Sequence, residues 1–295
     1  MLKLKLLNDF YDYLLEKNYS SNTILSYKKD LEQFRIYCKD KSIKDIDYNF
    51  IRTYLCFLYD KKYTSKSVSR HISSLKSFFK FLMQNEIIKI NPMLLINSPK
   101  IEKKLPNYLN YKDLEFILSI PDKNDVLGLR NALILELLYS CGVRVSELVN
   151  IRLSDIDFSN KRILILGKGN KERFVLYGNV CEKLLDDYIS TSRNVLLKVE
   201  NDYLLLNKFG NKITDRAIRM IIDEVIKKSS LKLKISPHTF RHTFATHLLN
   251  EGADLKIVQE LLGHENISTT GIYTHVSNEH LRKVYLDSHP RAKKN

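Results

Sequence analysis

The chain has 295 residues, a length that argues for two domains, with one large domain as the alternative. Hydrophobic residues make up 44% and charged residues 28%, which is typical of a globular protein and excludes a fibrous or membrane class. No segment approaches the roughly 18 uncharged apolar residues of a membrane helix. The first residues also lack the unbroken apolar stretch of a signal peptide. We therefore expect a cytoplasmic protein without a membrane partner.

The net charge of +14 indicates a polyanionic partner. Residues 1–105 contain 20 Lys and Arg against 11 Asp and Glu, and residues 106–295 contain 28 against 23. Both parts are basic, and the shorter part carries more of the excess. Charge alone does not separate DNA, RNA and anionic lipid, and an AT-rich genome that inflates Lys is an alternative origin.

The first 90 residues are expected to form four helices, because apolar side chains recur there at helical spacing. The first carries Leu4 to Leu14, the second Ile24 to Tyr37 after a cap in Ser20–Asn22, the third runs from about Tyr48 to Tyr59, and the fourth carries Val68 to Leu82 after a cap in Thr64–Ser65. We interpret their aromatic residues as core. The basic residues of the fourth helix are interpreted as phosphate contacts, with a solvated face as the alternative: Arg70, His71, Lys76 and Lys80.

Three prolines between Asn91 and Pro106 and the charged run Lys100–Lys104 indicate an exposed linker. We therefore place a first domain at residues 1–90, a linker at 91–107 and a second domain at 108–295. The elements expected in the second domain are helices at 111–119 and 127–139, strands at 162–166 and 173–176 around a Gly167–Asn170 turn, a helix at 178–191, a short strand at 203–206, a helix at 214–228, a helix from Ser236-Pro237 to about Asn250, and short helices to about 286.

Residues 238–249 read His-Thr-Phe-Arg-His-Thr-Phe-Ala-Thr-His-Leu-Leu and carry the first candidate site residues. His238 and Arg241 are three apart near a helix start, so they share a face. The free N–H groups of a helix start attract anions, which makes this a place for a phosphate. A metal site on His238 and His242 is the alternative, but no acidic partner of the usual kind lies between them. Cys38, Cys56, Cys141 and Cys181 are far apart and read as reduced thiols rather than metal ligands.

Other polar residues stand singly along the second domain. Arg144 and Glu147 lie on one helical face, Lys168 lies at the hairpin turn, and His264 precedes Tyr273 by nine residues. Each signal is weak alone, since an isolated tyrosine usually packs in a core. The segment from Gly167 also lacks the residue order of a phosphate-binding P-loop.

The ordered set of Arg, Lys, His-x-x-Arg, His and Tyr resembles the tyrosine recombinase (phage-type integrase) family, and looks most like its XerC/XerD branch. The resemblance covers essentially the whole chain and includes Gln259–His264 and the ending His289–Ala292. Two positions depart from the family pattern: Cys141 stands where threonine is common, and Gly271 where a longer polar residue is common. The resemblance implies six catalytic residues: Arg144, Lys168, His238, Arg241, His264 and Tyr273.

The implied reaction cuts and rejoins DNA strands through a 3′-phosphotyrosyl link. Arg144 and Arg241 would clamp the phosphate, and Tyr273 would attack it, with His238 as base or hydrogen-bond partner. Lys168 would protonate the leaving 5′-oxygen and His264 would bond the phosphate. Glu147 would orient its neighbours. The covalent link conserves the bond energy, so we expect no ATP, metal or other cofactor.

The implied fold is mainly α: a helical, SAM-like DNA-binding domain, then a mostly helical catalytic domain with a small three-stranded β-sheet, the DNA breaking-rejoining enzyme fold. Residues 277–295 would form a C-terminal segment that docks on a neighbouring protomer or packs on its own. The expected DNA contacts are Arg70, His71, Lys76, Lys171 and Arg173.

The implied partners are duplex DNA with a short inverted-repeat site, three further protomers in a tetramer on two sites, of one kind or with a second related recombinase, and a DNA translocase activator. The implied role is the resolution of chromosome or plasmid dimers during segregation. The alternatives are an integrase of a phage, plasmid or transposon, a relaxing topoisomerase, and a non-catalytic DNA-binding protein.

Overall fold

The computed structural model describes residues 4–100, 108–167, 172–231, 233–263 and 278–292. The chain divides into two compact units, Met1–Lys104 and Leu105–Asn295, and each is described by itself. Within the described residues, no helix is both long and apolar enough to cross a membrane.

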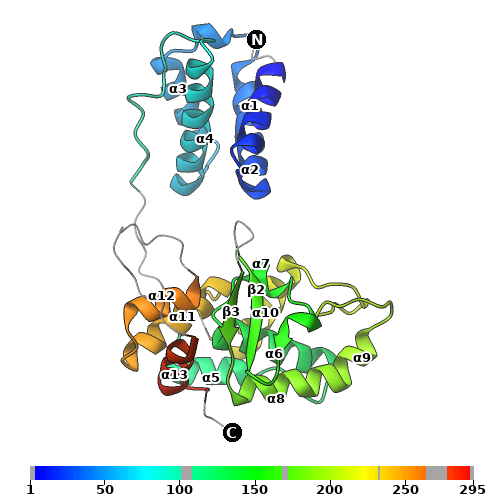
Figure 1. The fold of residues 1–295 in the computed structure, drawn as a ribbon. Coiled ribbons are helices and arrows are strands. Elements are labelled where there is room, and N and C mark those ends of the chain that lie inside the picture. Colours follow the sequence, from blue (N-terminus) through cyan, green and yellow to red (C-terminus); the bar gives the residue numbers. More distant parts are fainter. Residues whose placement is uncertain (1–3, 101–107, 168–171, 232, 264–277, 293–295) are drawn as a thin grey trace. The chain divides into compact units, whose positions relative to one another are not determined.

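The first unit contains the four expected helices (Figure 1): α1 (Leu4–Glu16), α2 (Ser21–Cys38), α3 (Tyr48–Asp60) and α4 (Ser65–Gln84), with a 3-10 turn η1 (Ile43–Asp45) before α3. The N-caps explain the starts of three of them. Ser20, Asp47 and Thr64 each accept a backbone N–H of the first turn through the side chain. The expected helices and the caps at Ser20 and Thr64 are confirmed.

The core of the first unit is rich in aromatic rings, as expected. Phe34 packs edge-on against Tyr54, with ring centroids 4.9 Å apart, and Phe10 packs the same way against Phe78 at 5.3 Å. Met93 and Ile96 are buried in the same core. The side chains of residues 93 and 96 therefore pack in the first unit, whereas we expected an exposed linker from residue 91.

The second unit is mostly helical with a three-stranded antiparallel sheet in the order β1-β2-β3. Its elements are α5 (Tyr111–Ser119), α6 (Val126–Ser140), α7 (Val145–Leu148), η2 (Leu153–Asp155), β1 (Ile156–Asp157), β2 (Arg162–Leu166), β3 (Glu172–Leu176), α8 (Asn179–Asp187), η4 (Tyr188–Ser192), α9 (Arg193–Leu196), α10 (Asp215–Ser229), α11 (Pro237–Asn250), α12 (Leu255–Leu262) and α13 (Asn278–Ser288). The expected pairing of β2 with β3 is confirmed, with Ile165 opposite Arg173.

The strand expected at residues 203–206 is wrong. Tyr203 and Leu206 make only isolated bridges, to Arg152 and Lys212, and the third strand of the sheet is β1. The three leucines 204–206 are buried. A short apolar run has the same composition whether it is a strand or a bonded core segment, which explains the error.

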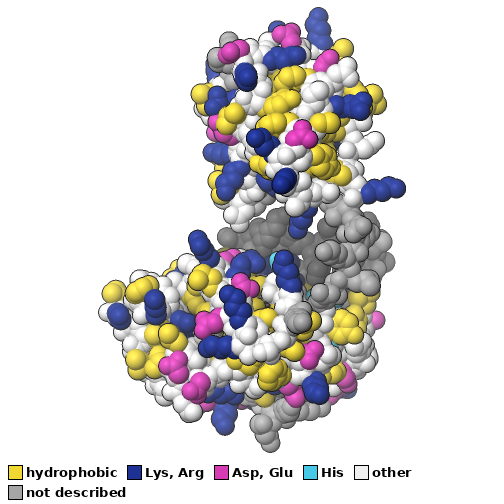
Figure 2. All heavy atoms as spheres, turned by 180° about the vertical axis from the view of Figure 1, so that it is seen from behind, with side chains coloured by type: hydrophobic (Ala, Val, Ile, Leu, Met, Phe, Trp, Pro, Cys, Tyr) yellow, Lys and Arg dark blue, Asp and Glu magenta, His cyan; other side chains and the backbone are white. Residues whose placement is uncertain are grey.

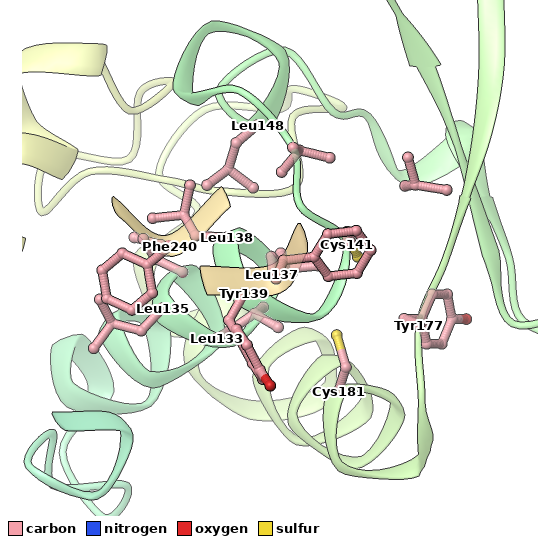
Figure 3. Close-up of a cluster of buried hydrophobic side chains, with 14 of the residues drawn as sticks. Leu133, Leu135, Leu137, Leu138, Tyr139, Cys141, Leu148, Tyr177, Cys181 and Phe240 are labelled. Carbon is pink, nitrogen blue, oxygen red and sulfur yellow. The ribbon is translucent and has the colours of Figure 1, made fainter. Parts of the chain in front are cut away.

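Helix α6 lies at the centre of the second unit. Nearly all of its residues are buried, and it packs against α8 and α11. Figure 3 shows its leucines and Tyr139 together with Phe240 of α11 and Cys181 of α8. A helix that is apolar all round belongs inside a core. The chain leaves this helix through Cys141 and Gly142 and reaches Arg144 within four residues of its end, so a rigid element positions that arginine.

The C-terminal residues 278–292 pack on their own unit. Tyr285 is buried and donates a hydrogen bond from its hydroxyl to the carbonyl of Ser140 at 3.2 Å. Arg291 pairs with the buried Glu136 of α6 at 2.9 Å. The backbone N–H of Asn179 donates to the carbonyl of Ala292 at 3.3 Å. Of the two alternatives for this segment, the single chain adopts packing on its own unit.

Candidate active site

The structure describes three of the six expected catalytic residues, Arg144, His238 and Arg241. Lys168, His264 and Tyr273 lie outside the described residues, as does the expected DNA contact Lys171. The described part of the site is built by the loop after α6, the first turns of α11, the end of α12 and strand β3.

Arg144 precedes α7 and is held by Glu147, three residues later. The backbone N–H of Arg144 donates to Oε2 of Glu147 at 2.8 Å, and its Nη1 donates to Oε1 at 2.7 Å. Both bonds follow from the spacing, since a carboxylate in the first turn of a helix reaches back to the N-cap. The Arg144 side chain is 37% exposed, so its guanidinium is fixed in direction and still accessible to a phosphate.

Arg173 of β3 binds the same carboxylate. Its Nη1 and Nη2 donate to the two oxygens of Glu147 at 3.1 and 2.9 Å. Burial by itself would raise the pKa of Glu147, but the hydrogen bonds from Arg173 and Arg144 lower it below its ordinary value. Glu147 therefore carries its charge at neutral pH, as the orienting role requires.

Arg241 lies on α11 and is buried, with its guanidinium bonded to two carbonyl groups. Nη1 donates to the carbonyl of Gly142 and Nη2 to that of Leu262, both at 2.5 Å. Burial, followed by the nearby positive charge of Arg144, lowers the pKa of Arg241 to about 10, while Glu147 opposes this. Arg241 stays charged at neutral pH beside a second cation, Arg144. A bound anionic phosphate would offset the repulsion between these two cations.

His238 is the second residue of α11. The helix begins after Ser236 with Pro237 at its first position, as expected from the sequence. The side chain of His238 is exposed, whereas Arg241, one turn later, is buried. His238 therefore stands at the solvent end of the face whose inner end holds Arg241. Within the described ranges, no group of three His, Cys, Asp or Glu side chains is placed to hold a metal ion.

His247, at the other end of α11, was missed by the sequence reading. Its Nδ1 lies 2.9 Å from the Tyr139 hydroxyl and its Nε2 lies 2.9 Å from the Leu109 carbonyl oxygen. The ring stacks on Tyr111 at 3.9 Å. Burial lowers its pKa. His247 thus ties α11 to α6 and to the start of the unit, and the only signal for it in the sequence was its helical spacing from Phe240 and Phe244.

The DNA contacts expected on α4 differ in how far their side chains are exposed. Lys76 is exposed. Arg70 is 42% exposed and pairs with the buried Asp30 at 2.6 Å, so one side of its guanidinium is fixed by the protein. His71 is buried against Tyr54 and Asp30, and this corrects its interpretation as a phosphate contact. A polar side chain on a basic helix can also complete a buried hydrogen-bond network, which in this case includes Ser74 as well.

Arg173 is a second correction among the expected DNA contacts. Its side chain is only 16% exposed, and its two terminal nitrogens are bonded to Glu147. The remaining surface is still basic, and Figure 2 shows Lys and Arg side chains over both units on the face seen from behind.

Comparisons with known proteins show the family of the chain. The model of the phage integrase family matches residues 107–280, and that of the phage integrase N-terminal SAM-like domain matches residues 7–86. Tyrosine recombinase XerC of Anoxybacillus flavithermus is 48% identical over 97% of this chain and 98% of its own. XerC of Staphylococcus carnosus is 45% identical over 96% of each chain.

Two solved structures extend the similarity to the fold. The XerH site-specific recombinase, in a post-cleavage complex with a palindromic difH substrate, has a TM-score of 0.72 at 28% identity, covering 92% of this chain and 81% of that one. XerA recombinase has a TM-score of 0.51 at 30% identity, covering 97% of this chain and 99% of that one. The chain therefore belongs to the phage integrase family, the tyrosine recombinases.

Proposed function

We propose that this protein is a Xer-like site-specific recombinase that cleaves and rejoins DNA through a 3′-phosphotyrosyl link at Tyr273. One observation carries the proposal: Arg144 and Arg241 are both fixed before any substrate binds. Glu147 orients the first, and the carbonyls of Gly142 and Leu262 orient the second. Fixed donors need no reorganisation when charge builds up on a phosphate, and this is the main source of electrostatic catalysis.

The fixed arginines suit a phosphodiester because its negative charge repels a nucleophile. Two guanidinium groups bound to the non-bridging oxygens would offset that charge and stabilise the five-coordinate transition state. The Tyr273 hydroxyl, with a pKa near 10 in water, needs help to lose its proton at neutral pH. His238, exposed at the start of α11, is the proposed base or hydrogen-bond partner.

The leaving 5′-oxygen needs a proton, which we assign to Lys168 as general acid. His264 is the proposed further donor to the phosphate. Reversal of the same steps by a 5′-hydroxyl of another strand completes the exchange. Because the phosphotyrosyl link conserves the bond energy, the proposed chemistry proceeds without ATP.

The proposed substrate is duplex DNA with a short inverted-repeat site, in line with the palindromic substrate named for XerH. Exposed cations on both units would give an affinity that falls steeply with salt. We propose a tetramer on two sites, formed by this protein alone or with a second related recombinase and activated by a DNA translocase, acting in the cytoplasm to resolve chromosome or plasmid dimers.

Covalent trapping tests the proposal. A nicked duplex carrying the inverted-repeat site would be incubated with the wild type, Tyr273→Phe and the control Tyr111→Phe, which removes an exposed hydroxyl bonded to Glu251. We expect a denaturation-resistant, protease-sensitive adduct from the wild type and the control only. An adduct from Tyr273→Phe would show another nucleophile. No adduct from the wild type, even with the second recombinase supplied, would refute the proposed reaction.

A further inference from the structure

Arg173 of β3 completes the coordination of the carboxylate that orients Arg144. Each oxygen of Glu147 accepts one hydrogen bond from Arg173, at 3.1 Å for Oε1 and 2.9 Å for Oε2. Each oxygen also accepts one from Arg144, at 2.7 and 2.8 Å. The carboxylate is only 5% exposed. A bidentate guanidinium fixes the plane of a carboxylate as well as its position, so Arg173 sets the direction from which Glu147 holds Arg144.

Arg173 also supports the backbone of Gly263. A Cβ atom at residue 263 would lie 2.8 Å from Cδ and 2.9 Å from Nε of Arg173, so the glycine backbone rests directly on the arginine side chain. Gly263 ends α12 with φ of +66°, a conformation that glycine adopts without strain. His264, the next residue in the sequence, lies outside the described residues.

The backbone of Arg173 belongs to the hairpin whose turn contains Lys168. Arg173 pairs with Ile165, and Glu172 pairs with Leu166 at the end of β2. Residues 168–171 lie outside the described residues. The Arg173 side chain thus contacts Glu147 and Gly263, and its backbone belongs to the β2–β3 hairpin.

We propose that Arg173 is a positioning residue for DNA cleavage: it holds Glu147 so that Arg144 keeps the direction in which it acts on the phosphate. The proposal rests on the recombinase function proposed above. Arg173 transfers no proton and binds no substrate in this role. Without Arg173, Arg144 and Arg241 would be the remaining cations that face Glu147 among the described residues.

The test compares Arg173→Lys and Arg173→Gln with the wild type in single-turnover cleavage at saturating protein, with site affinity measured separately. Lysine cannot form two parallel bonds to a carboxylate. We expect adduct formation to slow by about a hundredfold in both variants, the size reported for a misplacement of about 1 Å, while affinity stays that of the wild type. The matched control is Arg162→Gln, which removes an arginine–aspartate pair of the same sheet and should cleave normally.

A double mutant separates positioning from general weakening of the fold. In a Glu147→Gln background, the further change Arg173→Gln should cause little additional loss, because the two residues act as one unit. Wild-type cleavage by Arg173→Gln would overturn the proposal. So would a loss of affinity with an unchanged saturating rate, which would make Arg173 a DNA contact.

A second readout keeps the inference testable if the proposed function fails. Should the wild type form no adduct, the Glu147 carboxyl can be titrated by carbon-13 NMR in the wild type and Arg173→Gln. The pKa of Glu147 should rise in the variant, because a hydrogen-bonded cation is lost while Arg144 and Arg241 remain. An unchanged pKa would show that Arg173 does not control the carboxylate.

Discussion

Arg241 donates a hydrogen bond to the carbonyl of Gly142 across a sequence separation of 99 residues. This contact joins α11, which carries His238 and Arg241, to the loop that leads from α6 to Arg144. The loop can present its carbonyl only because residue 142 has φ of +58°, which L-amino acids other than glycine adopt with strain. The two proposed phosphate clamps are therefore held together by backbone geometry.

Replacement of Gly142 by alanine should destabilise the second unit and slow cleavage. A Cβ atom would lie 2.7 Å from Cδ1 of Phe244 and 3.0 Å from Cδ2 of Leu262. We expect a loss of about 3 kcal/mol in the free energy of unfolding, from backbone strain together with overpacking. Gly252→Ala is the matched control, since its φ is +86° but nothing lies within 4 Å, and strain alone should cost about 1 kcal/mol. Urea denaturation measures both, and equal losses would contradict the packing argument.

The variant Arg241→Lys should fold but cleave slowly. A lysine cannot bond two carbonyls and a phosphate in a fixed plane, so we expect the single-turnover rate to fall about 10²- to 10³-fold. Arg193 is also a buried arginine bonded to carbonyls, those of Asn201 and Tyr203, and Arg193→Lys serves as the control. If both variants slow cleavage equally, the effect belongs to the fold and not to the site.

Removing the C-terminal ion pair should cost more than removing a surface pair. Arg291→Gln leaves the carboxylate of Glu136 buried without its cation, which we expect to cost about 3 kcal/mol or more. Lys228→Gln removes the exposed pair with Glu224 and should cost under about 0.5 kcal/mol. Chemical denaturation of both variants would decide it, and a loss in Arg291→Gln no larger than in the control would show that the tail is not anchored there.

The stability of the second unit should fall between pH 7.5 and pH 5. Burial, together with the nearby Arg291 and His247, lowers the pKa of His289 from 6.5 to about 3. Below pH 6.5, His289 therefore binds a proton in the unfolded chain but stays neutral in the folded chain. The free energy of unfolding consequently decreases as the pH falls toward 3. The expected loss from this residue at pH 5 is about 2 kcal/mol. His289→Phe, which suits the surrounding Tyr139, Phe244 and Tyr285 rings, should flatten the curve, and an unchanged slope would argue against the buried neutral imidazole.

The helices could be predicted from the sequence because local signals define them. Ser20, Thr64 and Ser236 each mark a start, and apolar spacing defines the buried face of each amphipathic helix. The hairpin of β2 and β3 followed from alternation around a glycine turn. The run at residues 203–206 could not be assigned this way, because Tyr203 pairs with Arg152, which lies far away in the sequence.

The candidate site residues were named from the sequence, but the contacts between them were not. Arg144, His238 and Arg241 were named from their order along the chain. The roles of Arg173, His71 and Asp30 depend on burial, which residue type and spacing do not report. The sequence does not show whether a charged residue on a basic helix or strand faces DNA or belongs to a buried ion pair. The exposure of each side chain in the structure distinguishes the two.

The pairing of Arg291 with Glu136 spans 155 residues, and this has a consequence for synthesis of the protein. The buried carboxylate of α6 stays without this counter-ion until residue 291 has left the ribosome. Contacts of such long range are slow to form. The packing of α6, the helix that leads to Arg144, is therefore complete only after residue 291 has been synthesised and has folded back onto it.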